Sequence, residues 1–296
     1  MHDTTTSHDF RARVSGVIRL TRPRQWIKNA FVLAPLFFTL EFFNPSSVYL
    51  ALQAVVLCCL ASSAVYIVND LRDIEHDRRH PKKSRERPLA SGVVSVPVAL
   101  VLLVALYALL VCGWFVAPGV VAVLAIYLAL NLAYSFILKY QPVVDIFTIA
   151  IGFVLRVYAG AVALDVPVSA WMFITTLCLA LYMAAIKRRQ ELRHSGTGGR
   201  RVLKKYSVAL IDRYAEMSAT GALLFYSMYV LSEPEKQRLV VTIPLVLFGL
   251  FRFWYIVEVL DKGESPTDVV LADWPLLLAV LLWIAACAWA LWPVSG

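Results

Sequence analysis

The chain has 296 residues, of which 60% are hydrophobic and 16% are charged, and its net charge is +8. A water-soluble globular domain is about half apolar and about a quarter charged, so this composition excludes an ordinary soluble protein. In a membrane protein an excess of Lys and Arg reports orientation and contact with anionic lipid. We therefore expect no nucleic-acid partner.

Nine apolar blocks are separated by short polar segments. Each block reaches or approaches the roughly 20 residues that a helix needs to cross the hydrocarbon core of a membrane. The sequence therefore predicts an all-α membrane protein with nine transmembrane helices that form one domain over residues 1–296. The blocks are 27–43, 48–69, 96–116, 119–138, 142–163, 168–187, 211–232, 239–260 and 272–292.

The distribution of Lys and Arg predicts the orientation of the chain. If the N-terminus is cytoplasmic, 24 of the 28 basic residues fall on the cytoplasmic side: six within 1–28, seven within 70–95, nine within 187–213, and Lys139 and Lys262. Cytoplasmic loops of membrane proteins carry such an excess. We expect residues 1–25 to be a cytoplasmic segment, 70–95 and 187–213 to be the two long cytoplasmic loops, and the C-terminus to be external. The protein could function as a monomer or as a homo-oligomer, and the sequence is compatible with both.

Two basic residues lie near the start of the first apolar block. Arg22 and Lys28 are placed at the depth where the phosphate of a membrane lipid would lie, so they are candidates for binding a lipid phosphate. The alternative is anchoring to lipid headgroups, with Trp26 as part of an interfacial aromatic belt.

An acidic run, Asn69-Asp70-x-x-Asp73-x-x-x-Asp77, ends the second block. On one continuous helix the three carboxylates would fall within about 60° of one another. Carboxylates gathered in this way repel unless a cation lies between them, and hard oxygen ligands suit Mg²⁺, which also takes substrate phosphate oxygens. The alternative is a solvated acidic helix end beside neighbouring arginines.

A basic segment, residues 80–92, follows the acidic run directly. It contains Lys83, Arg85 and Arg87. Basic side chains next to a carboxylate–metal site provide what a diphosphate requires, because the metal and the cations share its negative charge. Taken alone, the segment is equally explained as a cytoplasmic anchor that contacts lipid headgroups.

The turn between the fourth and fifth blocks carries Tyr134, Lys139 and Asp145 at the expected cytoplasmic face. Lys139 is a candidate phosphate ligand and Asp145 a candidate metal ligand. The alternatives are an interfacial tyrosine, an orienting lysine and a carboxylate at a helix start.

Arg156 lies inside the fifth block, eleven residues after Asp145. The two residues share a helix face about 16 Å apart along the axis. An arginine within the membrane is costly and is a functional candidate, but a buried structural ion pair explains it equally well. Arg252 and Glu258 in the eighth block raise the same question.

The sixth block ends in a basic cluster. Lys187 and Arg188 can bind phosphate, and Glu191, one turn further on, can orient either side chain. The alternative is a basic cluster that merely stops membrane insertion. Between the last two blocks, Asp268 and Asp273 are candidates for a gate that closes the site from the cytoplasm. A helix cap is the alternative for Asp268.

The run Asn69–Asp77 resembles the first aspartate-rich motif of the UbiA prenyltransferase superfamily, and the resemblance extends over essentially the whole chain. It implies a bundle of nine membrane helices with a polar cavity that opens to the cytoplasm, in a multi-pass protein of the cell (inner) membrane. On this resemblance, residues 1–296 form one catalytic domain, and 70–95 and 187–213 are its active-site loops. Typical members carry a second aspartate-rich motif after the sixth helix. Residues 187–192 are basic there instead.

Residues 22–29, 64–70, 143–146 and 187–192 are similar to the decaprenyl-phosphate phosphoribosyltransferase branch of that superfamily. The resemblance implies Mg²⁺-dependent transfer of a 5-phosphoribosyl group from phosphoribosyl diphosphate (PRPP) to a polyprenyl phosphate. It implies Asp73 and Asp77 as catalytic residues, with Asp70 as a further Mg²⁺ ligand. The implied PRPP-binding residues are Asn69, Lys83, Arg85, Arg87, Tyr134, Lys139, Asp145, Lys187, Arg188 and Glu191, with Asp145 or Glu191 placed for a ribose hydroxyl.

Two other functions compete with this prediction. A prenyltransferase acting on an aromatic acceptor would require a second acidic diphosphate site, which the segment near residue 190 lacks. A transporter would require polar, broken helices near the middle of the membrane, whereas most charge here lies at predicted helix ends.

Overall fold

The computed structural model describes residues 14–79, 83–195, 201–232, 234–261 and 266–292, which are helical or lie in turns and short connections, with no β-strand among them. Six segments are long and apolar enough to cross a membrane: α3 (Pro45–Arg72), α6 (Val96–Trp114), α7 (Pro118–Phe136), α8 (Val144–Leu164), α9 (Ala170–Ser195) and residues Lys236–Glu258. The expectation of an all-α, multi-spanning membrane protein is confirmed.

The remaining long elements are α10 (Val208–Leu231), α11 (Ile243–Glu258), which forms part of the sixth segment, and α13 (Trp274–Ala290). α13 is apolar but has only 17 residues, and α10 carries Asp212, Arg213 and Glu216. The count of nine spans therefore stays a prediction, as does the orientation of the two termini.

The first predicted helix, 27–43, has a different structure. A 3-10 helix, η1 (Pro23–Leu33), precedes a short α2 (Ala34–Phe38) and a single turn, η2 (Glu41–Phe43). Pro35 explains the change at this point, because proline has no N–H to donate and its ring clashes with the preceding helical turn. Leu40, with φ of 65°, lies between α2 and η2 and caps the start of η2.

The segments predicted as cytoplasmic loops also contain helices. Residues 70–95 hold the end of α3, α4 (Ile74–Arg79) and α5 (Lys83–Glu86). Residues 187–213 hold the last turns of α9, a 3-10 turn η5 (Arg201–Lys205) and the start of α10. The prediction placed the end of α9 at the first charged residue, but the helix continues to Ser195 because buried partners satisfy those charges.

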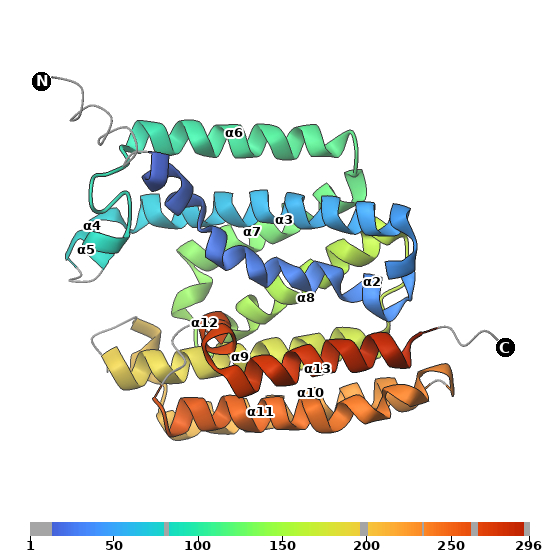
Figure 1. Ribbon diagram of the computed structural model, residues 1–296. Coiled ribbons are helices and arrows are strands. Elements are labelled where there is room, and N and C mark those ends of the chain that lie inside the picture. Colours follow the sequence, from blue (N-terminus) through green and yellow to red (C-terminus); the bar gives the residue numbers. More distant parts are fainter. Residues whose placement is uncertain (1–13, 80–82, 196–200, 233, 262–265, 293–296) are drawn as a thin grey trace, which may run out of the picture.

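The long helices lie side by side in a bundle, with α6 at one edge and α10 and α11 at the other (Figure 1). One end of the bundle carries α4 and α5, α12 (Pro266–Ala272) lies further inward at the start of α13, and α2 lies toward the opposite end. Short connections are η3 (Leu138–Tyr140) and η6 (Pro234–Thr242). The outward face of α6 exposes Val101 and Val104, as expected for a lipid-facing helix.

A close helix crossing fixes the position of η1. A Cβ atom added to Gly160 of α8 would overlap the backbone carbonyl of Val32. Small residues allow such backbone approaches between membrane helices. Ala54 and Ala61 of α3 and Ala159 of α8 are buried in the same core. The N-terminal element therefore packs tightly between α3 and α8.

Candidate active site

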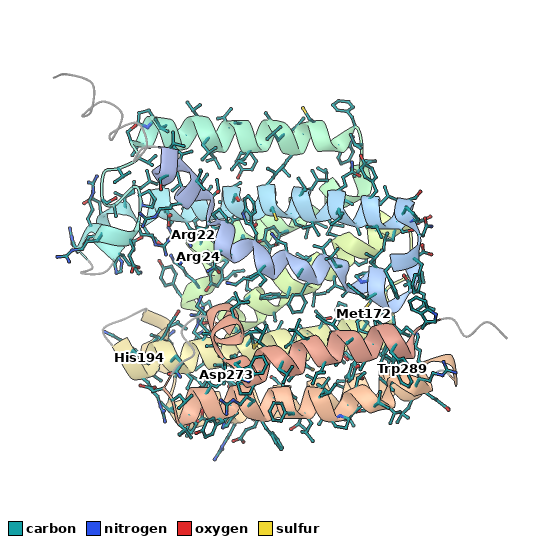
Figure 2. All side chains as sticks on the ribbon, viewed as in Figure 1. Arg22, Arg24, Met172, His194, Asp273 and Trp289 are labelled. Atoms are coloured by element: carbon teal, nitrogen blue, oxygen red, sulfur yellow. The ribbon has the colours of Figure 1, made fainter. Side chains whose placement is uncertain are left out.

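Charged side chains gather toward the end of the bundle that carries α4 and α5. Figure 2 shows Arg22, Arg24, His194 and Asp273 toward this end, with Met172 and Trp289 toward the other. The predicted site residues lie at the ends of α3, α7, α8 and α9 and on the short elements between them. Two clusters can be distinguished among them.

The first cluster is centred on Asp70, which is buried. Arg22 and Arg87 both donate to its Oδ1, the latter at 2.6 Å. Its Oδ2 is also buried and has no hydrogen-bond partner among the described residues. A carboxylate oxygen that is dehydrated and unpaired is costly, so this atom is placed to accept a ligand that supplies positive charge.

The helix that carries the acidic run is interrupted. α3 ends at Arg72, Asp73 caps it, and Asp77 lies on α4, although the N–H of Asp77 still bonds to the carbonyl of Asp73 at 2.8 Å. Asp77 is buried with Asp70, whereas the Asp73 side chain is 42% exposed. The single helical face expected for the three carboxylates is therefore broken at Asp73.

Basic residues occupy the surroundings of these carboxylates. The Nζ of Lys83 lies 3.3 Å from Asp77 Oδ1, and that of Lys139 lies 3.7 Å from Asp73 Oδ1. Asn69 accepts a hydrogen bond from Ser135 of α7. The described residues contain no group of three acidic, histidine or cysteine side chains placed to hold a metal ion.

The carboxylates of the first cluster can be compared with what a bound Mg²⁺ requires. Mg²⁺ commonly uses one or two carboxylates together with substrate phosphate and water, so a ready-made group of three is not required. The unpaired Oδ2 of Asp70 fits such a ligand, and Asp73 is accessible. Each carboxylate also has a basic neighbour, and the side chain of that neighbour can bind a phosphate oxygen instead of the carboxylate. The residues present therefore fit a metal that arrives together with a phosphorylated substrate.

The second cluster is centred on Arg188, and its guanidinium is fully buried. Its Nε donates to Asp145 Oδ2 at 2.6 Å, Nη1 to Glu191 Oε2 at 2.6 Å, and Nη2 to the Tyr134 hydroxyl at 2.7 Å. Asp145 is also buried, while Glu191 is partly exposed. The guanidinium thus joins α7, α8 and α9 and fixes the partly exposed Glu191.

Tyr206, which the sequence did not predict, completes this cluster. Its hydroxyl donates to Asp145 Oδ1 at 2.7 Å and accepts from the Val143 N–H at 2.5 Å. Burial raises the pKa of Tyr206, so the phenol stays protonated and remains a donor. No motif links Tyr206 to Asp145, because 61 residues separate them.

Two consecutive residues connect the clusters. Tyr134 of α7 bonds to Arg188 in the second cluster, and Ser135 bonds to Asn69 in the first. A few residues further on, Lys139 of η3 reaches Asp73. The end of α7 therefore brings together residues that are distant in the sequence.

Other predicted residues take different places. Arg85 is exposed on α5, while Lys28 and Lys187 are half-buried on η1 and α9. Asp273 caps α13 by accepting from the Leu276 N–H, and it forms a two-point ion pair with Arg252. Asp268 lies in α12, and its side chain is outside the described residues.

Arg189, next to Arg188, faces the other side of α9. It donates to Asp212 of α10 at 2.5 Å and to Glu258 of α11. Arg188 and Arg189 are adjacent in one basic cluster of the sequence, but they are buried on different sides of α9 and bind different carboxylates. The partner of Glu258, which the sequence left open, is this arginine together with Arg193.

The fold and these clusters define a helical membrane protein with a charged site at one end of its bundle. Residues 30–270 match the model of the UbiA prenyltransferase family. The chain belongs to this family. Over 298 residues it is 35% identical to the decaprenyl-phosphate phosphoribosyltransferase of Mycolicibacterium smegmatis, covering 94% of this chain and 93% of the relative.

Two further similarities agree. The decaprenyl-phosphate phosphoribosyltransferase of Mycobacterium tuberculosis is 36% identical over 287 residues, which cover 92% of this chain and 93% of the relative. A solved UbiA homologue from Archaeoglobus fulgidus, bound to GPP and Mg²⁺, superimposes with a TM-score of 0.70 at 20% identity, covering 93% of this chain and 99% of the homologue. The predicted family and its fold are confirmed.

Proposed function

We propose that the protein transfers a 5-phosphoribosyl group from PRPP to a polyprenyl phosphate and releases diphosphate. The observation that carries this proposal is the 35–36% identity to decaprenyl-phosphate phosphoribosyltransferases over more than nine-tenths of both chains. The site agrees with it, because a hydrogen-bonded cluster centred on the buried Arg188 stands where a prenyltransferase would carry a second acidic motif.

The first cluster is assigned to the diphosphate. Mg²⁺ held by Asp73 and Asp77 with Asp70 would neutralise charge on the departing diphosphate. Lys83 and Arg87, which contact Asp77 and Asp70, exchange their carboxylate partners for phosphate oxygens. Asn69, fixed by Ser135, orients the end of α3.

The second cluster is assigned to the phosphoribosyl group. Glu191, whose side chain is 22% exposed, is an acceptor suited to a ribose hydroxyl, and Lys187 and Lys139 supply positive charge for the 5-phosphate. Asp145 is fully buried, with its two oxygens bonded to Arg188 and Tyr206, so we assign it to holding Arg188 in place. Arg188 is fully buried, so we assign it to orienting Glu191 and Tyr134, with direct substrate contact left to the more exposed groups. Arg85, exposed on α5, is placed for long-range attraction of the anionic substrate.

The chemistry needs no protein base. The C1–O bond to diphosphate breaks, positive charge develops on the ribose ring, and an oxygen of the lipid phosphate attacks C1 from the opposite face, which inverts that centre. The phosphate is already ionised near neutral pH. Lys28, with Arg22 at the start of η1, is assigned to this lipid phosphate, and Arg22 would link the lipid subsite to Asp70.

We further propose the topology in the membrane. The N-terminus and the charged end of the bundle face the cytoplasm, and the C-terminus is external, in the cell membrane. η1 with α2, α10 and α13 would complete nine spans within one catalytic domain. The small, irregular first span is consistent with its close packing against α8.

A direct assay tests the proposal. Purified protein in lipid nanodiscs receives Mg²⁺, PRPP labelled in the ribose, and a polyprenyl phosphate, and the label entering the lipid fraction is counted. We expect lipid labelling that stops on chelation and returns with added Mg²⁺. Labelling that is absent here, while a prenyl diphosphate and an aromatic acid give product, would establish the prenyltransferase alternative instead.

A further inference from the structure

Arg156 is a buried cation that the proposed chemistry does not use. It lies on α8 eleven residues from Asp145, about 16 Å deeper in the bundle. It was expected to be either a functional arginine or one half of a buried ion pair. Its hydrogen bonds to described residues go to an amide oxygen, a backbone carbonyl and a phenol, and none of these partners is a carboxylate.

Three hydrogen bonds fix the guanidinium. Nε donates to Asn29 Oδ1, Nη1 to the Gly152 carbonyl and Nη2 to the Tyr127 hydroxyl, each at 2.8 Å. The rings of Tyr127 and Phe153 lie 4.8 and 5.1 Å from its Cζ. These partners stabilise the positive charge through oriented dipoles and ring faces.

Asn29 extends the network to α3. Its Nδ2 lies 3.2 Å from Ser62 Oγ and 3.1 Å from Cys59 Sγ. Arg156 thus joins η1, α7 and α8 directly and α3 through Asn29. These four elements carry Arg22, Tyr134, Asp145 and Asp70 at their charged ends.

The contacts continue along η1 toward the site. Trp26 Nε1 donates to Ser63 Oγ at 3.1 Å, and Ser63 donates to the Thr21 carbonyl at 3.0 Å. Arg22, the next residue, donates to Asp70. A 3-10 helix has poorer internal hydrogen bonds than an α-helix, so the register of η1 depends on these side chains.

We propose that Arg156 is a positioning residue that sets the register of η1 against α3 and thereby holds Arg22 on Asp70. The register then decides where the diphosphate cluster stands relative to the lipid-phosphate subsite. A buried arginine within a membrane protein is expensive, and this role gives a reason for its presence. The effect on catalysis rests on the proposed function, but the effect on η1 does not.

The first test is independent of activity. Hydrogen–deuterium exchange is followed in wild type and in Arg156→Lys, which keeps the charge but loses the planar three-way geometry. We expect faster exchange in residues 23–33 and unchanged exchange in α10 and α13. Arg252→Lys is the matched control, because it makes the same substitution at an arginine of α11 that pairs with Asp273. It should leave exchange in residues 23–33 unchanged.

The second test is a double-mutant cycle on phosphoribosyl transfer. Arg156→Lys and Arg22→Gln are each expected to lower kcat/KM by about fivefold or more, and the double variant by no more than the larger single effect, because both act on one contact. Multiplying effects would mean that Arg156 acts elsewhere and would overturn the proposal, as would unchanged exchange in residues 23–33.

A milder variant covers the case in which Arg156→Lys does not fold. Tyr127→Phe removes one hydrogen bond from the network and keeps the ring against Arg156. It should show the same local exchange on a smaller scale, and uniform destabilisation would contradict the proposal. If wild type lacks transfer while the exchange pattern appears, the proposed function fails and the positioning of η1 stands.

Discussion

Arg188 on α9 and Asp145 on α8 form an ion pair of 2.6 Å in which the two side chains are 1% and 0% exposed. A charge pair taken out of water in this way is stable only when the other polar atoms of both groups are also satisfied. Glu191, Tyr134 and Tyr206 provide those contacts. The pair is therefore the centre of a network, and disturbing one member has predictable costs.

Removing the carboxylate tests this network. Asp145→Ala leaves the buried Arg188 without its main counterion, and we expect a loss of about 3–5 kcal/mol in the free energy of unfolding. Arg193→Gln is the control, because Arg193 and Glu258 form a partly exposed pair at 3.3 Å; its loss should cost less than about 1 kcal/mol. Equilibrium unfolding in mixed detergent micelles measures both. Equal costs would show that burial of the Asp145 pair carries no special weight.

Much of this site could be predicted from the sequence, because charge in an apolar chain marks helix ends. Asp70, Lys83, Arg87 and Asp145 were all placed from that pattern, and the structure brings the first three into one cluster. The pattern could not show that α3 breaks at Asp73, since the break depends on a single turn residue.

Pairings between distant residues could not be predicted. Tyr206 reaches Asp145 and Arg189 reaches Glu258 only after the bundle has formed, and nothing local in the sequence distinguishes Arg188 from Arg189. The 3-10 geometry of η1 was missed for a similar reason. It depends on the close contact with Gly160 as well as on Pro35.

A substitution at Asp73 tests whether this residue binds Mg²⁺ or only stabilises the fold. Its side chain is accessible and its contact with Lys139 is long, so Asp73→Asn should change the free energy of unfolding by less than about 1 kcal/mol. Phosphoribosyl transfer should fall by roughly 100-fold, because charge on the leaving diphosphate loses a stabilising group. Titration with Mg²⁺ should show a higher requirement.

Glu75→Gln is the matched control for Asp73→Asn. Glu75 lies two residues further on, is more exposed and pairs with Arg78 at 3.1 Å. We expect wild-type transfer and an unchanged Mg²⁺ requirement. A stable Asp73→Asn protein with full activity would remove Asp73 from the metal site.

A substitution at Asp273 tests whether this residue acts as a gate to the site or only as the cap of α13. Asp273→Asn keeps an oxygen that can accept from the Leu276 N–H at the start of α13, but it weakens the two-point contact with Arg252. If Asp273 is structural, kcat/KM should stay within about twofold of wild type. A large change in KM for PRPP with an unchanged melting temperature would favour the gate.

Two glycines on α8 test how tightly η1 is packed. A Cβ at Gly160 overlaps the Val32 carbonyl, and backbone cannot move aside as a flexible side chain can. We therefore expect Gly160→Ala to lower the free energy of unfolding by about 1–3 kcal/mol or more. Gly152 is the control on the same helix, since its nearest neighbours would lie 3.7 Å from a new Cβ, an ordinary contact distance.

Gly152→Ala should be neutral or stabilising by up to about 1 kcal/mol, because alanine loses less backbone entropy than glycine in a helix. The two variants add the same methyl group to α8, so their difference isolates the crossing with η1. If η1 carries Arg22 to Asp70 as its contacts indicate, Gly160→Ala should also reduce phosphoribosyl transfer more than Gly152→Ala does. Thermal unfolding and the transfer assay on the same preparations decide this, and equal behaviour of the two variants would show that the crossing is loose enough to tolerate a side chain.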